Sequence, residues 1–129
     1  MTLVDRVLRA TKSPWFRLLA LVALGGLAVA SLMPSDAGLP RTRLPGPVEH
    51  FLAYCAVAAI IGTAFRNLVT LRTLLVAMIV YAGVLEFSQQ WAPGREASVI
   101  DFLASAAGAV AGLSAAACLL WARGRYRRI

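Results

Sequence analysis

The stretch LLVAMIVYAGVLEFSQQW, residues 74–91, is long and apolar enough to cross a bilayer as a helix, yet it contains the carboxylate of Glu86. Its apolar residues are continuous, without the alternation of a membrane β-strand, so a helix is predicted. Ionisable side chains inside membrane segments are costly and are usually retained for function. The stretch therefore predicts a membrane protein with an internal polar site that includes Glu86.

The composition of the whole chain agrees with a membrane protein. Of its 129 residues, 60% are hydrophobic, and the mean hydropathy is +0.73, which exceeds the usual range of soluble domains. Four apolar runs each approach the roughly 20 residues that a spanning helix needs. We expect an all-α polytopic membrane protein, a single domain over residues 1–129, with four transmembrane helices at about residues 15–33, 48–65, 71–91 and 99–121.

The basic residues indicate how these helices are oriented. The net charge is +7, and ten of the thirteen Lys and Arg residues fall on one side of a four-span arrangement; only Arg41, Arg43 and Arg95 fall on the other. This is the positive-inside bias, which places both termini in the cytoplasm. We therefore expect a multi-pass protein of the bacterial inner membrane. The distribution disfavours nucleic acid as a partner, although the charge alone would suggest it.

The first apolar run also has features of a signal peptide. Basic residues precede it, and its end, AVASLM at residues 28–33, offers small residues as a cleavage site. However, the run is longer than the apolar core of a normal signal peptide. We therefore expect this helix to be retained.

Polar residues gather at one end of the four spans. Going outward, the third run ends with Glu86 and Gln89, and Arg95 follows in the next loop. The second run begins near His50 and the fourth near Asp101. All five positions then lie near the outer leaflet, and the sequence predicts that their side chains converge.

Helical spacing refines this convergence in the second and third runs. Glu86, Gln89 and Gln90 stand at positions i, i+3 and i+4, so they share a face, and we expect only one of the two glutamines to point inward. His50 and Tyr54 are also four residues apart. The second and third runs thus each present a polar face at the same depth.

The fourth run carries a stripe of small and polar residues. Asp101, Ser105, Gly108 and Gly112 follow one face of the predicted helix. A Gly-x-x-x-Gly pair allows close packing of membrane helices. We therefore expect Asp101 to face the interior of the bundle and not the lipid.

The chemistry of the set suggests a ligand. Arg95 is the expected counter-charge for Glu86 or Asp101, and Arg, His and amide donors suit an anionic headgroup. Acids beside a histidine can also perform general acid–base catalysis, with His50, Glu86 and Asp101 as the catalytic candidates. We expect no metal and no cofactor, since one histidine is a poor ligand supply. The expected ligand-binding residues are His50, Tyr54, Glu86, Gln89, Arg95, Asp101 and Ser105.

A structural role is the alternative for the same residues. Glu86, Arg95 and Asp101 could form an ion network that closes the hairpin between the third and fourth helices, and the glutamines could join helices by hydrogen bonds. Glu49 and Glu96 are expected to be solvated. These alternatives stay open at the level of the sequence.

Two segments resemble the VanZ-like family. PVEHFLAYCAV, residues 47–57, is similar to the family's acid-Lys-x-x-His-Phe-x-x-Tyr pattern. GVLEFSQQWAPGREASVIDFLASAAGAVAG, residues 83–112, is similar to its Glu-x-x-Gln, Pro-Gly-Arg and Asp-Leu-x-x-Asn-x-x-Gly series. The chain departs from the family at Gly46 and Pro47, which replace the acid-Lys pair, and at Ser105, which replaces the Asn.

The resemblance implies a small integral membrane protein of a family named for a protein associated with resistance to teicoplanin, a glycopeptide that binds cell-wall precursors. We expect binding or handling of an anionic lipid or lipid-linked cell-envelope precursor, with a link to teicoplanin resistance as an analogy. The alternatives are a membrane hydrolase or transferase acting on a lipid-linked substrate, and a structural membrane protein whose polar network only holds the helices together. A homo-oligomer is a further candidate assembly.

Overall fold

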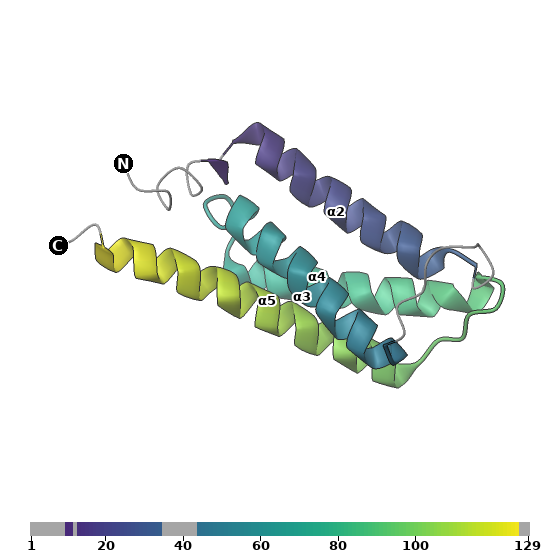
Figure 1. The fold of residues 1–129 in the computed structure, drawn as a ribbon. Coiled ribbons are helices and arrows are strands. Elements are labelled where there is room, and N and C mark those ends of the chain that lie inside the picture. Colours follow the sequence, from purple (N-terminus) through teal and green to yellow (C-terminus); the bar gives the residue numbers. More distant parts are fainter. Residues whose placement is uncertain (1–9, 12, 35–43, 127–129) are drawn as a thin grey trace.

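The computed structural model describes residues 10–11, 13–34 and 44–126, and this part of the chain is α-helical without strands (Figure 1). Each of the four long helices is long and apolar enough to cross a membrane, as predicted. Their bounds are α2 Pro14–Leu32, α3 Gly46–Phe65, α4 Leu71–Ser88 and α5 Val99–Tyr126, and the 3-10 helix η1, Gln89–Trp91, follows α4.

The predicted spans differ little from these bounds, except that α5 continues beyond the expected end at residue 121. The basic residues before position 10, most of the predicted outer loop at residues 34–47 and the end of the basic tail lie outside the described residues. The charges that predict the orientation are therefore only partly within the described structure.

Local sequence signals explain where the helices begin. Ser13 precedes α2, and its hydroxyl accepts a hydrogen bond from the Phe16 N–H at 3.1 Å. Thr70 precedes α4 in the same way and accepts from the Thr73 N–H at 3.2 Å. Both are N-caps, which satisfy amide groups that the first turn leaves unpaired. Gly94, with a φ of 70°, helps reverse the chain after η1, because glycine adopts this conformation without steric cost.

The closest helix packing is between α3 and α5, and it depends on glycines. A Cβ atom at Gly108 would overlap the Phe51 carbonyl oxygen of α3 and would lie 3.1 Å from the Cys55 nitrogen. One at Gly112 would overlap the Cys55 carbonyl oxygen. The predicted small-residue stripe is thus confirmed, since only glycine permits this approach of two backbones.

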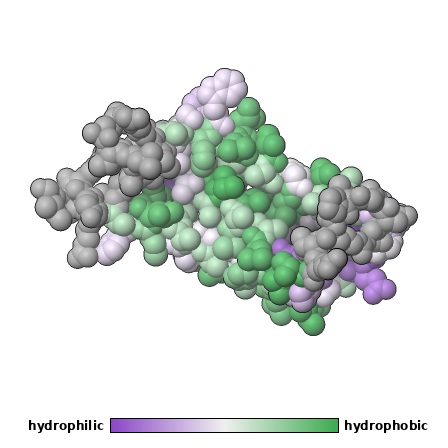
Figure 2. Space-filling model, in the orientation of Figure 1, coloured by the Kyte–Doolittle hydropathy of each residue, from purple (hydrophilic) through white to green (hydrophobic). Residues whose placement is uncertain are grey.

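The outer surface of the bundle is apolar. Figure 2 shows hydrophobic residues over the middle of the visible face, with the most hydrophilic described residues toward the ends. Large hydrophobic side chains such as Leu18, Val80 and Leu119 are exposed. A soluble monomer rarely presents so continuous an apolar surface, and this surface suits helices that cross a membrane.

Candidate functional site

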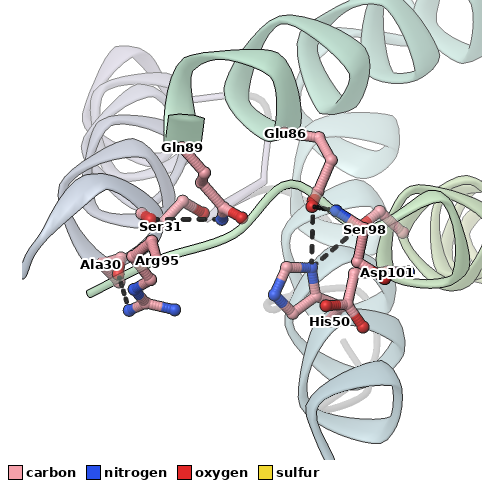
Figure 3. Close-up of polar contacts among 9 residues, drawn as sticks. Ala30, Ser31, His50, Glu86, Gln89, Arg95, Ser98 and Asp101 are labelled. Atoms are coloured by element: carbon pink, nitrogen blue, oxygen red, sulfur yellow. Dashed lines mark hydrogen bonds and ion pairs between the residues drawn. The ribbon is translucent and has the colours of Figure 1, made fainter. Parts of the chain in front are cut away.

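The polar residues lie at the end of the bundle opposite the start of α2 (Figures 1 and 3). Here the end of α2 meets the start of α3, η1, the loop 92–98 and the start of α5. The predicted convergence at one end is confirmed. However, the residues form two adjoining groups, a carboxylate group around Glu86 and a cavity beside Arg95, and His50 belongs to both.

Glu86 is the centre of the carboxylate group. It is only 7% exposed, and its Oε1 accepts a hydrogen bond of 2.6 Å from the backbone N–H of Ser98, just before α5. Its Oε2 lies 3.9 Å from His50 Nδ1. The carboxylate therefore links α4 to both α3 and the start of α5, and its negative charge is favourable at that helix N-terminus.

His50 is held by α5 as well as by Glu86. Its Nδ1 lies 3.3 Å from the Ser105 hydroxyl, which is buried against α3. Figure 3 shows the ring with Nδ1 facing Glu86 and with Nε2 directed toward the side on which Arg95 lies. When Nδ1 carries the proton, it can donate to either partner, and Nε2 is left as an acceptor or base.

Asp101 faces the bundle interior, as predicted. Its Oδ1 is buried and has no hydrogen-bond partner among the described residues. A Cβ atom at Gly46, in the first turn of α3, would lie 3.6 Å from Oδ1. An acidic side chain at position 46 would therefore bring a second carboxylate toward Asp101.

The expected pairing of Arg95 with Glu86 or Asp101 is wrong. Arg95 Nε donates to the Met33 carbonyl at 3.1 Å, and Nη2 donates to the Ala30 carbonyl at 3.0 Å. The last carbonyls of a helix lack partners within it, and a cation is favourable at that end. Arg95 therefore caps α2, and Figure 3 shows it apart from both carboxylates.

Gln89 also fastens the end of α2. It is 3% exposed, and its Nε2 donates to the Ser31 carbonyl at 3.2 Å. Gln90 is exposed, so the expectation that one of the two glutamines points inward is confirmed. The common face predicted for Glu86, Gln89 and Gln90 does not extend to Gln90, because the α-helix ends at Ser88 and tightens into η1.

A cavity of about 130 Å³ lies between α2, α3 and Arg95. The expected site residues His50, Tyr54 and Arg95 line it, whereas the other expected residues do not: Glu86, Gln89, Asp101 and Ser105. The full lining comprises Leu27, Ala30, Ser31, Glu49, His50, Ala53, Tyr54 and Arg95.

Two polar cavity residues were not expected. Glu49, expected to be solvated, is only partly exposed and lines the cavity. Ser31 is buried in the α2 wall; the only sequence signal for it is a lone hydroxyl near the end of an apolar run. Nothing in the spacing of Glu49 distinguishes it from a solvated residue, because its role depends on where α2 packs.

The residues that line the cavity carry hydrogen-bonding groups without a partner among the described residues. A guanidinium has five N–H donors; Arg95 gives two of them to carbonyls, and the other three have no acceptor among the described residues. The Tyr54 hydroxyl and the Glu49 carboxylate make no hydrogen bond within the described ranges. Among those residues, no group of three His, Cys, Asp or Glu side chains could hold a metal ion.

Comparisons with protein-family models, curated proteins and solved structures returned no match for this chain.

Proposed function

We propose that the protein binds the anionic headgroup of a membrane lipid or lipid-linked envelope precursor in the cavity between α2, α3 and Arg95. The observation that carries this proposal is the Arg95 guanidinium, which two carbonyls hold at the cavity wall and whose other three donors have no acceptor within the described ranges. Guanidinium groups bind phosphate and carboxylate oxygens through paired, charge-assisted hydrogen bonds.

The surroundings of the cavity suit a lipid. Trp91 is 69% exposed and Val99 is 75% exposed at the same end of the bundle, and tryptophan is enriched where membranes meet water. A headgroup could enter the cavity while its acyl chains remain against the apolar outer surface. This geometry favours a membrane-bound ligand over a free anion.

The proposal includes the setting that the sequence predicts. The chain is placed in the bacterial inner membrane as a divergent VanZ-like protein, with its basic ends in the cytoplasm and the cavity at the outer leaflet. In that setting, expression in a susceptible host should reduce sensitivity to teicoplanin. Unchanged susceptibility, with the protein present in the membrane, would argue against the resistance link but not against lipid binding.

Lipid binding by purified protein tests the main proposal. Native mass spectrometry can count the phospholipid molecules retained when the protein is released from micelles containing phosphatidylglycerol. Arg95→Gln should lose the bound lipid, and Arg66→Gln, which removes an exposed charge at the opposite end, should keep it. Arg95→Lys keeps the positive charge but lacks the paired N–H groups of the guanidinium. It therefore separates the effect of charge from the effect of capping α2. Retention of wild-type binding by Arg95→Gln would overturn the proposal.

A second candidate function is hydrolysis of a lipid phosphate ester, favoured by the arrangement of His50 between Glu86 and Ser105. His50 Nε2 would accept a proton from a water molecule as the water oxygen attacks phosphorus, and the ester P–O bond would break with protonation of the leaving oxygen. Phosphate release from a polyprenyl phosphate, abolished by His50→Gln, is the expected result. No release by the wild-type protein, with lipid binding intact, would exclude this candidate.

A further inference from the structure

The cavity contains a carboxylate as well as a guanidinium. Glu49 and Arg95 both line it, yet no ion pair joins Glu49 to Arg95 or to any other residue within the described ranges. Two residues of opposite charge thus line one space without an ion pair between them. A purely anionic ligand bound to Arg95 would be repelled by Glu49, whereas a ligand with both charges would be attracted at both ends.

We propose that the ligand is zwitterionic and of the phosphoethanolamine class, with its phosphate at Arg95 and its primary ammonium at Glu49. This inference depends on the proposed headgroup binding and specifies its chemistry. Glu49 supplies the counter-charge. Tyr54, whose hydroxyl has no hydrogen-bond partner within the described structure, and His50 line the same cavity and offer further acceptors.

The acceptors of the cavity distinguish a primary ammonium from a quaternary one. A primary ammonium has three N–H donors to give to the carboxylate, hydroxyl and imidazole groups. A trimethylammonium group has none, and would leave those acceptors unpaired on entry. The site should therefore prefer phosphoethanolamine to phosphocholine as well as to phosphoglycerol.

The size of the cavity is consistent with a short headgroup. Its volume is about 130 Å³, several times the roughly 10–15 Å³ that a cavity needs to hold one water molecule. The cavity therefore has room for several non-hydrogen atoms, as in a phosphate joined to a two-carbon amine. A glycan headgroup would have to extend outside the cavity, beyond the residues that line it.

The experiment measures headgroup preference and its dependence on Glu49. The protein is purified in micelles holding equal fractions of phosphatidylethanolamine, phosphatidylcholine and phosphatidylglycerol with matched acyl chains, and the retained lipids are counted by native mass spectrometry. The wild type should retain phosphatidylethanolamine preferentially. Glu49→Gln should reduce its preference over phosphatidylglycerol about tenfold, because one charged hydrogen bond is lost.

Control variants separate the ammonium site from general effects of charge and folding. Glu96→Gln removes an exposed carboxylate beside Arg95 in sequence, and should leave the preference unchanged. Glu49→Lys should reverse the preference toward phosphatidylglycerol, which a merely unfolded variant would not do. Soluble phosphoethanolamine should compete weakly with the lipid; if it competes as well as the intact lipid, a membrane source is excluded.

The outcomes distinguish this inference from the function on which it depends. If wild type and Glu49→Gln retain phosphatidylethanolamine and phosphatidylglycerol equally, and Arg95→Gln loses both, the ammonium site is overturned and headgroup binding stands. If Arg95→Gln also retains both lipids, headgroup binding itself is overturned. Loss of the phosphatidylethanolamine preference in Glu49→Gln alone supports the proposal.

Discussion

Replacement of Glu86 should distinguish a structural acceptor from a group whose charge matters. The carboxylate is 7% exposed and accepts a 2.6 Å hydrogen bond from the Ser98 N–H. A hydrogen bond to a charged group contributes about 1.5–3 kcal/mol, and an amide left unpaired by its loss costs about 1–3 kcal/mol. Because these two contributions overlap, Glu86→Ala should lower the free energy of unfolding by about 3 kcal/mol.

Glu86→Gln should have a smaller effect. Its amide oxygen can still accept from Ser98, so the loss should be about 1 kcal/mol, the difference between a charged and a neutral acceptor. Its NH₂ group would replace the oxygen that lies 3.9 Å from His50 Nδ1, and would favour the tautomer with the proton on Nε2. The ring would then lose its acceptor toward the cavity.

Unfolding in mixed micelles, driven by an increasing fraction of denaturing detergent and followed by circular dichroism, measures both values. Glu96→Ala, at an exposed position of the loop, is the matched control and should cost less than about 0.5 kcal/mol. If Glu86→Ala is equally mild, the hydrogen bond to Ser98 contributes nothing to the fold. If Glu86→Gln costs as much as Glu86→Ala, the reasoning about a retained acceptor is refuted.

Three further predictions concern the packing of the helices. Gly108→Ala should lower stability by more than about 2 kcal/mol, because its Cβ would overlap the Phe51 carbonyl oxygen. Gly25→Ala is the control: a Cβ there meets nothing within 4 Å, so the substitution should be neutral or stabilising. Equal effects of the two substitutions on thermal unfolding would contradict the close contact. Arg95→Gln should accelerate hydrogen exchange in the last turn of α2, and exchange at the wild-type rate would show that its two carbonyl contacts do not hold that turn. Tyr81→Phe removes a 2.6 Å hydrogen bond to the α2 backbone and should cost about 1 kcal/mol; an unchanged unfolding midpoint would rule out that contribution.

Much of the fold was predictable because membrane helices follow from the length and continuity of apolar runs. The interior position of Glu86 and the close packing at Gly108 and Gly112 were predictable for a related reason, since both depend on spacing along a single helix. The structure confirms these expectations. They require no knowledge of how distant helices are placed.

The partners of the polar groups were not predictable in the same way. Charge alone pairs Arg95 with the nearest carboxylates, but its acceptors are backbone carbonyls at the end of α2. Every helix ends in such carbonyls, so the sequence does not show which of them Arg95 binds. Glu49 looked solvated because its position in the cavity depends on α2. Sequence thus located the site at one end of the bundle, while tertiary packing determined which charges meet.

A crystal structure from a lipidic phase, with native lipid retained, would show directly whether a headgroup occupies the cavity. Phosphate density is expected within hydrogen-bonding distance of the Arg95 N–H groups that do not bind α2, with acyl chains outside the cavity against the apolar surface. An acyl chain filling the cavity, or Arg95 turned away from it to pair with Asp101, would rule out headgroup binding by Arg95.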